Sequence, residues 1–134
     1  MINYISLLRS KGLRATNLRL AVIRHLDQNH GPFTAQEIFE QLGSTGNLAT
    51  IYRIVESFVD NGLALKCNFE DGFSRYEIFH TKKEHHHHVI CTKCQNWENI
   101  AFCPVDLSYE KIEKMGFTEI SHRLEFFGIC STCR

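Results

Sequence analysis

The spacing of apolar residues predicts a bundle of helices in the first half of the chain. A short helix is expected over residues 4–11, ended by Gly12. Thr16 can cap the next helix, and the capping-box sequence of residues 34–37 can begin a third. In these segments apolar side chains recur every three or four residues, which indicates helices packed around a shared core.

The fourth predicted helix follows Asn47 and is the most clearly two-sided. Asn61-Gly62 ends it, because glycine suits the left-handed position after a helix. Two runs over residues 63–69 and 73–79 flank an Asp-Gly pair and predict a β-hairpin. Helices followed by a hairpin are typical of a winged helix-turn-helix. The apolar stripe of the fourth helix comprises Leu48, Ile51, Val55, Phe58 and Val59.

The second half of the chain has the pattern of strands with one helix. Strands are expected over residues 86–91 and 97–102, and a helix over about 106–115. Residues 118–127 alternate between apolar and polar side chains, which predicts a long strand. The sequence therefore predicts an α+β protein with an N-terminal domain, residues 1–79, and a C-terminal domain, residues 80–134.

Composition and charge narrow the functional classes only slightly. The sequence has no 18-residue apolar run and no signal peptide, so we expect a cytoplasmic protein without a membrane span. The formal net charge is 0, but residues 1–66 carry seven Lys/Arg against five Asp/Glu, and residues 67–134 carry eight against ten. The small positive excess in the first half permits a nucleic-acid face.

Two Cys-x-x-Cys pairs, Cys91/Cys94 and Cys130/Cys133, are the most distinctive chemistry in the sequence. Four thiolates can surround zinc in a closed tetrahedron, which is the pattern of structural zinc sites. The alternatives are two local disulfides or unpaired buried thiols. The expected cytoplasmic location favours zinc.

Four consecutive histidines precede the first cysteine pair. On a strand, His86 and His88 would lie on one face, and His85 and His87 on the other, so the run can serve two metal sites. Two imidazoles need further partners to hold a metal tightly. The candidate partners are Glu77, His80, Cys67, Asp106 and His122.

Three of the isolated residues also have ordinary interpretations. Cys67 and Cys103 are read as small buried apolar residues, although a redox role stays open. His122, on the apolar side of its predicted strand, is more commonly a core histidine than a ligand. It becomes a ligand only if the fold brings it to the histidine strand.

Together these motifs resemble the ferric uptake regulator family of bacterial metal-dependent repressors, along essentially the whole chain. The resemblance implies an N-terminal winged helix, a C-terminal α/β dimerisation domain and metal at the hinge between them. The matching segments are Gly12-Leu13-Arg14-Ala15-Thr16 with Arg19, Thr34-Ala35-Gln36-Glu37-Ile38, Leu48-Ala49-Thr50-Ile51-Tyr52-Arg53, residues 85–94 and residues 128–133.

The resemblance also implies a DNA-binding face on the N-terminal domain. Tyr52 and Arg53 would contact the major groove, with Thr50 near the backbone. Arg14 is similar to the family's minor-groove cation, and Arg19 to a phosphate contact. Arginine can bind guanine through two hydrogen bonds, and tyrosine can pack on a thymine methyl group. The alternative for Tyr52 is packing in the core.

Two further metal sites are implied by the resemblance. The dimerisation-domain site would use His85, His87, Asp106 and His122. The hinge sensor site would use His86 and His88, completed in one of two ways. Iron and peroxide sensors use an acid that matches Glu77, but this chain has Pro32 and Asn99 where they have a histidine and an acid, with Glu98 one residue away. A zinc-type set would instead be Cys67, His80, His86 and His88.

The sequence thus predicts a homodimeric repressor that binds double-stranded DNA at a palindromic operator and controls genes of metal uptake or homeostasis. It would hold one structural Zn²⁺ and sense a second divalent metal, Zn²⁺, Fe²⁺ or Mn²⁺. Sulfur with imidazoles favours zinc and the zinc uptake regulator branch.

An iron, manganese or peroxide-stress regulator is the alternative within the family. Outside it, the alternatives are a metalloenzyme and a zinc-ribbon interaction module. An enzyme is not expected, since no His-Glu-x-x-His or similar pairing is present.

Overall fold

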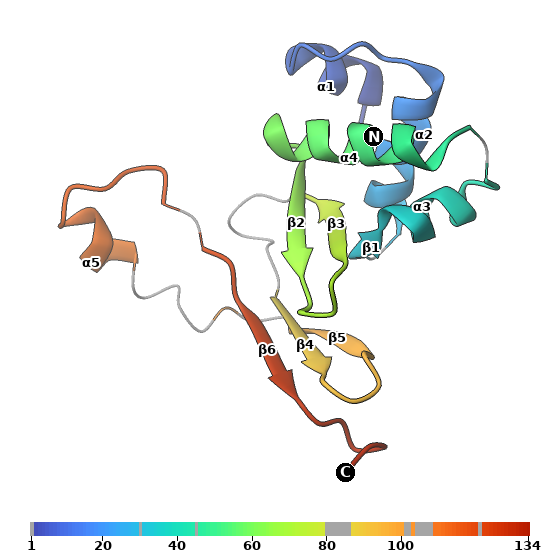
Figure 1. Cartoon of the computed structure of the whole chain (residues 1–134). Helices are drawn as coiled ribbons and strands as arrows, with labels where there is room; N and C mark the ends of the chain where they lie inside the picture. Colours follow the sequence, from blue (N-terminus) through green and yellow to red (C-terminus); the bar gives the residue numbers. More distant parts are fainter. Residues whose placement is uncertain are drawn as a thin grey trace. The chain divides into compact units, whose positions relative to one another are not determined.

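The structure is a computed structural model, and it divides the chain into two compact units, Met1–Phe79 and His80–Arg134. Figure 1 shows the ribbon of both. The described residues are 2–29, 31–44, 46–79, 87–100, 103, 109–120 and 122–134.

The first unit begins with helices whose ends follow the sequence signals. The Thr16 hydroxyl accepts a hydrogen bond from the Arg19 N–H (3.3 Å), and Thr34 and Glu37 form the predicted capping box. Such a cap contributes about 1 kcal/mol. Asn47 caps the fourth helix through its side chain, which confirms all three predicted starts. The helices are α1 (Tyr4–Ser10), α2 (Asn17–Gln28), α3 (Ala35–Gln41) and α4 (Leu48–Asp60).

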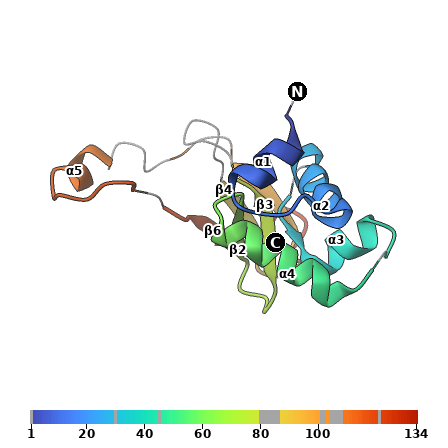
Figure 2. The ribbon, with the colours of Figure 1, turned by 90° about the horizontal axis from the view of Figure 1, so that it is seen from above.

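The predicted hairpin follows α4. Strands β2 (Ala64–Asn68) and β3 (Ser74–Ile78) pair antiparallel, and the short β1 (Phe33–Thr34) adds to the other edge of β3. The sheet order is therefore β1-β3-β2. The hairpin is the wing, and α3 with α4 is the helix-turn-helix, seen from above in Figure 2.

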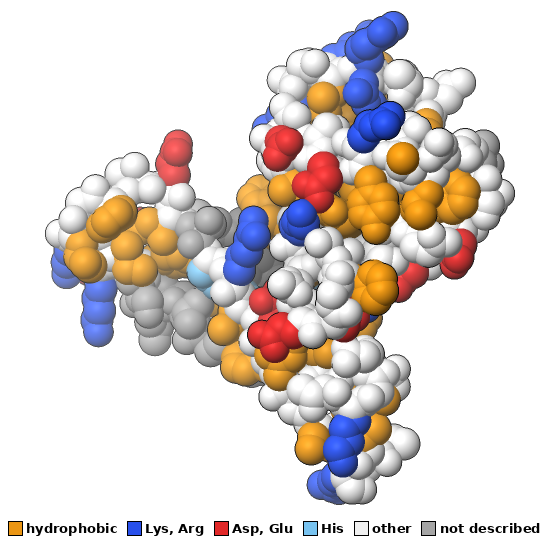
Figure 3. Space-filling view, in the orientation of Figure 1, with side chains coloured by type: hydrophobic (Ala, Val, Ile, Leu, Met, Phe, Trp, Pro, Cys, Tyr) orange, Lys and Arg blue, Asp and Glu red, His pale blue; other side chains and the backbone are white. Residues whose placement is uncertain are grey.

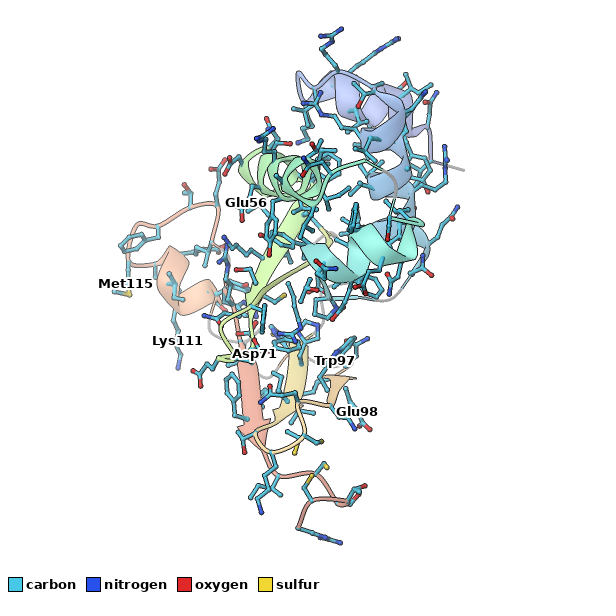
Figure 4. The ribbon with its side chains drawn as sticks, turned by 45° about the vertical axis from the view of Figure 1, so that its right-hand side comes forward. Glu56, Asp71, Trp97, Glu98, Lys111 and Met115 are labelled. Atoms are coloured by element: carbon cyan, nitrogen blue, oxygen red, sulfur yellow. The ribbon has the colours of Figure 1, made fainter. Side chains whose placement is uncertain are left out.

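One apolar core joins the helices to one face of the hairpin. Val22, Ile38, Ile51 and Phe58 are fully buried, and Tyr76 of β3 joins them. The Tyr76 hydroxyl donates to Glu56 of α4 at 2.5 Å, and Lys66 of β2 donates to the same carboxylate at 2.8 Å (Figure 4). Burial of Tyr76, reinforced by Glu56, raises the pKa of this phenol. The wing is thus fixed to the fourth helix by packing and by polar contacts.

The second unit contains a small mixed sheet of order β5-β4-β6. Strand β4 (His87–Cys91) pairs antiparallel with β5 (Trp97–Ile100) and parallel with β6 (Glu125–Gly128). The helix α5 (Tyr109–Glu113) lies between β5 and β6 in sequence. The N-terminal winged helix and the C-terminal α/β domain confirm the predicted α+β class.

The prediction of one long strand over residues 118–127 is wrong for most of the residues described there. The ladder with β4 begins only at Glu125, and Glu119 has a φ of 52°, which is left-handed and not extended. The described part of α5 ends at Glu113, before the expected end at Met115, and residues 106–108, where the helix was expected to begin, lie outside the described part. Within the described ranges, no helix combines the length and the apolar character needed to cross a bilayer.

Candidate metal centres and nucleic-acid interface

The four cysteines of the two Cys-x-x-Cys pairs converge on one point. Cys91 ends β4, and Cys130 follows β6, so the parallel pairing of these strands brings the two pairs together. The sulfurs all lie within 4.8 Å of one another, and the Sγ atoms of Cys94 and Cys130 are 3.7 Å apart. The edge of a tetrahedron of thiolates around zinc is about 3.8 Å, whereas a disulfide is about 2.05 Å. We call this group the four-cysteine site.

The electrostatics of these thiols also favour a cation. The Cys130 backbone N–H donates to Cys91 Sγ at 3.4 Å, and this contact lowers the pKa of Cys91 to about 6. The hydrogen bond between Cys133 and Cys130 acts oppositely and raises the pKa of Cys133 to about 12. Thiolates this close repel one another, so all four ionise together only around a metal ion.

A second group of possible ligands lies at the other end of β4. The Nε2 atoms of His87 and His122 are 3.0 Å apart, and Cys103 Sγ lies 3.3 Å from the first and 3.2 Å from the second. We call these three residues the His87–Cys103–His122 cluster. His122 therefore reaches the histidine strand, which was the condition for its being a ligand. The interpretation of Cys103 as a plain apolar residue is wrong, because its thiol is partly exposed and contacts both imidazoles.

In both histidines of the cluster, the Nδ1 atom contacts a polar group outside the cluster. His87 Nδ1 lies 3.1 Å from the Leu124 carbonyl oxygen, and the Tyr109 hydroxyl contacts His122 Nδ1. A carbonyl only accepts, so His87 carries its hydrogen on Nδ1 and turns the Nε2 lone pair toward the cluster. No sequence signal pointed to Tyr109. For Cys103 a sign existed, since it lies three residues before the predicted ligand Asp106.

Four predicted ligands lie outside the described residues, so the structure places only part of each predicted set. From the dimerisation-domain set, His87 and His122 are together. From the hinge set, Cys67, Glu77 and His88 are described. The four outside are His80, His85, His86 and Asp106.

Cys67 and Glu77 are neighbours on the first unit. In the β2–β3 register Cys67 pairs with Arg75 and Leu65 with Glu77, so these side chains share one face of the hairpin. The Cys67 thiol donates to Glu77 Oε1 at 3.6 Å. This face is opposite to the one that packs against the helices through Tyr76. A thiol and a carboxylate, both capable of binding metal, therefore lie together on it.

His88 and His87 are adjacent on β4 and have different partners, as strand alternation predicts. The His88 ring lies edge-on to Trp97, with centroids 5.6 Å apart. Asn99 pairs directly with His88, and Glu98 pairs with Val89. Glu98, labelled in Figure 4, therefore lies on the opposite face of β5 from Asn99. Its carboxylate does not take the place of the acid that iron and peroxide sensors have at the Asn99 position.

The α4 surface presents the predicted DNA-contacting side chains. Ile51, Ile54 and Phe58 face the core, whereas Tyr52 is 42% exposed and Arg53 is exposed. The exposure of Tyr52 argues against the core-packing alternative. Thr50, near the start of the helix, is half-buried.

Arg14, the predicted minor-groove cation, and Arg19, the predicted phosphate contact, are linked to each other. Arg19 donates from Nη1 to the Arg14 carbonyl at 3.1 Å, while the Arg14 side chain is exposed. Figure 3 shows lysine and arginine side chains over the α1 and α2 end of this unit. Basic side chains are therefore available on the surface of the unit that carries the helix-turn-helix.

Comparison with known proteins agrees with this architecture. The sequence profile of the ferric uptake regulator family matches residues 10–127. The chain belongs to the ferric uptake regulator family. A "Ferric uptake regulation protein" of Legionella pneumophila is 33% identical over 133 residues, covering 95% of this chain and 96% of its own length. A "Peroxide-responsive repressor PerR" of Staphylococcus epidermidis is 31% identical over 138 residues, covering 97% and 87%.

A solved member of the ferric uptake regulator family has the same fold. The Vibrio cholerae ferric uptake regulator superposes with a TM-score of 0.78 at 27% identity, and the match covers 96% of this chain and 100% of that one. Family members are metal-binding, DNA-binding transcriptional repressors and not enzymes. Membership of this family supports a metal-responsive regulator and argues against the metalloenzyme and zinc-ribbon alternatives.

Proposed function

We propose that this protein is a cytoplasmic, zinc-responsive repressor that binds a palindromic operator as a homodimer and controls genes of zinc homeostasis. The observation that carries the DNA-binding part is α4, which buries one face in the core and exposes Tyr52 and Arg53 on the other. Arg53 would hydrogen-bond guanine in the major groove, and Tyr52 would pack on a thymine methyl group. Thr50, Arg14 and Arg19 would contact the backbone and the minor groove.

Apolar side chains on the second unit support a homodimer. Met115 is 72% exposed, Phe117 60% and Ile129 53%, and hydrophobic atoms are visible over α5 in Figure 3. Exposed apolar groups of this kind are common at protein–protein interfaces. Two copies related by a twofold axis would present two α4 helices at half-sites about 34 Å apart.

For the sensed metal we propose zinc, bound at the hinge by the predicted ligands. The supporting observation is the Cys67 thiol beside Glu77, since sulfur selects zinc over iron and manganese. Asn99 and Glu98 support the same choice, because neither supplies the acid of the iron and peroxide sensors. Pro32 likewise cannot ligate. The proposed set is the zinc-type one, Cys67, His80, His86 and His88, with Glu77 beside the Cys67 thiol.

DNA binding tests the proposal directly. Duplexes would be selected from a randomised library by the zinc-loaded protein, and their affinity measured with Zn²⁺, Fe²⁺ or Mn²⁺ while the four-cysteine site stays filled. Zinc is expected to strengthen binding about 5–150-fold, which corresponds to a coupling of about 1–3 kcal/mol. Equal affinity with and without added metal would contradict a sensor. Activation by iron or manganese alone would show that the Glu77 set, without Cys67, is the correct one.

A substitution at Arg53 tests the exposed face of α4. Arg53→Ala is expected to weaken operator binding by about 1–3 kcal/mol and to relax the preference at one base pair in each half-site. Lys111→Ala on α5 is the matched control, because it removes the same charge from the second unit. If both variants weaken binding equally and without loss of sequence preference, Arg53 contributes only general charge.

A further inference from the structure

We propose that Cys103 is a metal ligand, which with His87 and His122 binds a thiophilic divalent cation, zinc above all, in the second unit. The three ligand atoms are 3.0–3.3 Å apart. Around tetrahedral zinc, two imidazole nitrogens would be about 3.3 Å apart, and nitrogen and sulfur about 3.6 Å. The cluster is within a few tenths of an ångström of that triangle.

The hydrogen bonds behind the imidazoles support a metal site. The Leu124 carbonyl fixes the hydrogen of His87 on Nδ1, so the Nε2 lone pair points into the cluster. The Tyr109 hydroxyl contacts Nδ1 of His122, whose Nε2 also faces the cluster. Partners on the distant nitrogen of each ring are the usual arrangement around histidines that bind metal. With the hydrogen of His122 likewise on Nδ1 and donated to the Tyr109 oxygen, both Nε2 lone pairs face the cluster, and a cation would bind them and the thiolate at once.

This cluster is separate from the four-cysteine site. His87 and Cys91 are the two ends of β4, four residues apart, which places the sites about 13 Å from each other. The sequence predicted nitrogen and carboxylate ligands here, His85 and Asp106 with His87 and His122. A thiolate changes the selectivity, because sulfur disfavours manganese and iron(II) relative to zinc. Water can complete the coordination of the three described ligands.

Cobalt(II) provides a test that needs no DNA and therefore stands apart from the proposed function. The full chain with zinc in the four-cysteine site is titrated with Co²⁺, and sulfur-to-cobalt charge-transfer absorption is recorded. Cys103→Ser is expected to lose the absorption assigned to this cluster and to bind the ion about tenfold more weakly, or worse. Cys67→Ser is the matched comparison: it removes the sulfur proposed for the hinge site, so it should lose only the absorption of that site and keep the part that disappears in Cys103→Ser.

Other results would overturn the assignment. Unchanged absorption and affinity in Cys103→Ser would mean that this thiol only hydrogen-bonds the histidines. Loss of all absorption in Cys67→Ser would place the sulfur ligand elsewhere. If Cys103→Ser does not fold, alkylation of the wild-type chain decides: Zn²⁺ should slow modification of Cys103 about tenfold or more, measured by mass spectrometry. Equal rates with and without Zn²⁺ would exclude ligation.

Discussion

The two units of this chain are stabilised by different means. The first buries a contiguous apolar core in which Leu8, Ile23, Ile51 and Phe58 are all fully inaccessible. Each such side chain contributes roughly 1.5–3 kcal/mol by burial. In the second unit, the buried apolar residues among those described are only Ile90 and Cys91. Candidate metal ligands lie at both ends of its central strand instead.

This contrast assigns different roles to the units. A unit with its own apolar core can keep the recognition helix rigid whatever the metal concentration. A unit whose strands are joined by metal ligands couples its structure to the metal. We therefore expect loss of zinc to destabilise the second unit and loss of core packing to destabilise the first.

Removal of the structural zinc is expected to have the largest effect. Cys94→Ser should abolish zinc binding at the four-cysteine site, where a structural zinc ion would contribute on the order of 10 kcal/mol to folding. Hydrogen exchange would then show fast exchange of the β4 and β6 amides and slow exchange of α2 and α4. Cys67→Ser is the control and should keep this zinc. Protected β4 and β6 amides in the zinc-free protein would mean that apolar contacts suffice for the second unit.

A core substitution in the first unit should give the opposite pattern. Phe58→Ala removes a fully buried ring and is expected to destabilise the first unit by about 3–5 kcal/mol, without loss of bound zinc. Phe73→Ala is the control, because that ring is 60% exposed and its loss should change stability by less than about 0.5 kcal/mol. Denaturant unfolding and zinc analysis measure both quantities. Zinc release from Phe58→Ala at low denaturant would show that the two units fold as one.

The same contrast explains what the sequence could predict. The helices of the first unit were predictable because their signals are local: the Thr34 and Glu37 side chains satisfy backbone groups three residues away, and Asn47 caps α4 in a similar way. The four-cysteine site was also predictable, since two short turns each supply two ligands. Apolar periodicity then located the face of α4 that is buried.

Features of the second unit that depend on distant residues were not predictable in the same way. The alternation over residues 118–127 reports which side chains are apolar, but it does not show where a partner strand lies. The ladder accordingly starts at Glu125, and His122 lies in a non-strand segment that contacts His87. The side chains that Cys103 contacts lie 16 and 19 positions away in the sequence, so its place three residues before Asp106 did not identify them.

The smallest expected effect concerns an ion pair in the wing. Arg75 donates to both carboxylate oxygens of Asp71, at 3.0 and 2.8 Å, and this contact lowers the pKa of Asp71. A lowered pKa stabilises the folded state at pH values above the ordinary aspartate pKa of about 3.9, and the stabilisation is lost as the pH falls through the folded-state value. Asp71→Asn should therefore cost about 1 kcal/mol at pH 7.

Acid unfolding of Asp71→Asn would separate the two units by their pH dependence. The wild type and the variant are expected to converge in stability below the folded-state pKa of Asp71, while zinc release from the second unit on acidification stays the same in both. The ion pair belongs to the wing alone, whereas protonation of the thiolate ligands acts on the metal. Unfolding followed by hydrogen exchange at each pH distinguishes the units. A shift of the zinc-release step in Asp71→Asn would show that the wing and the metal-binding unit are thermodynamically coupled.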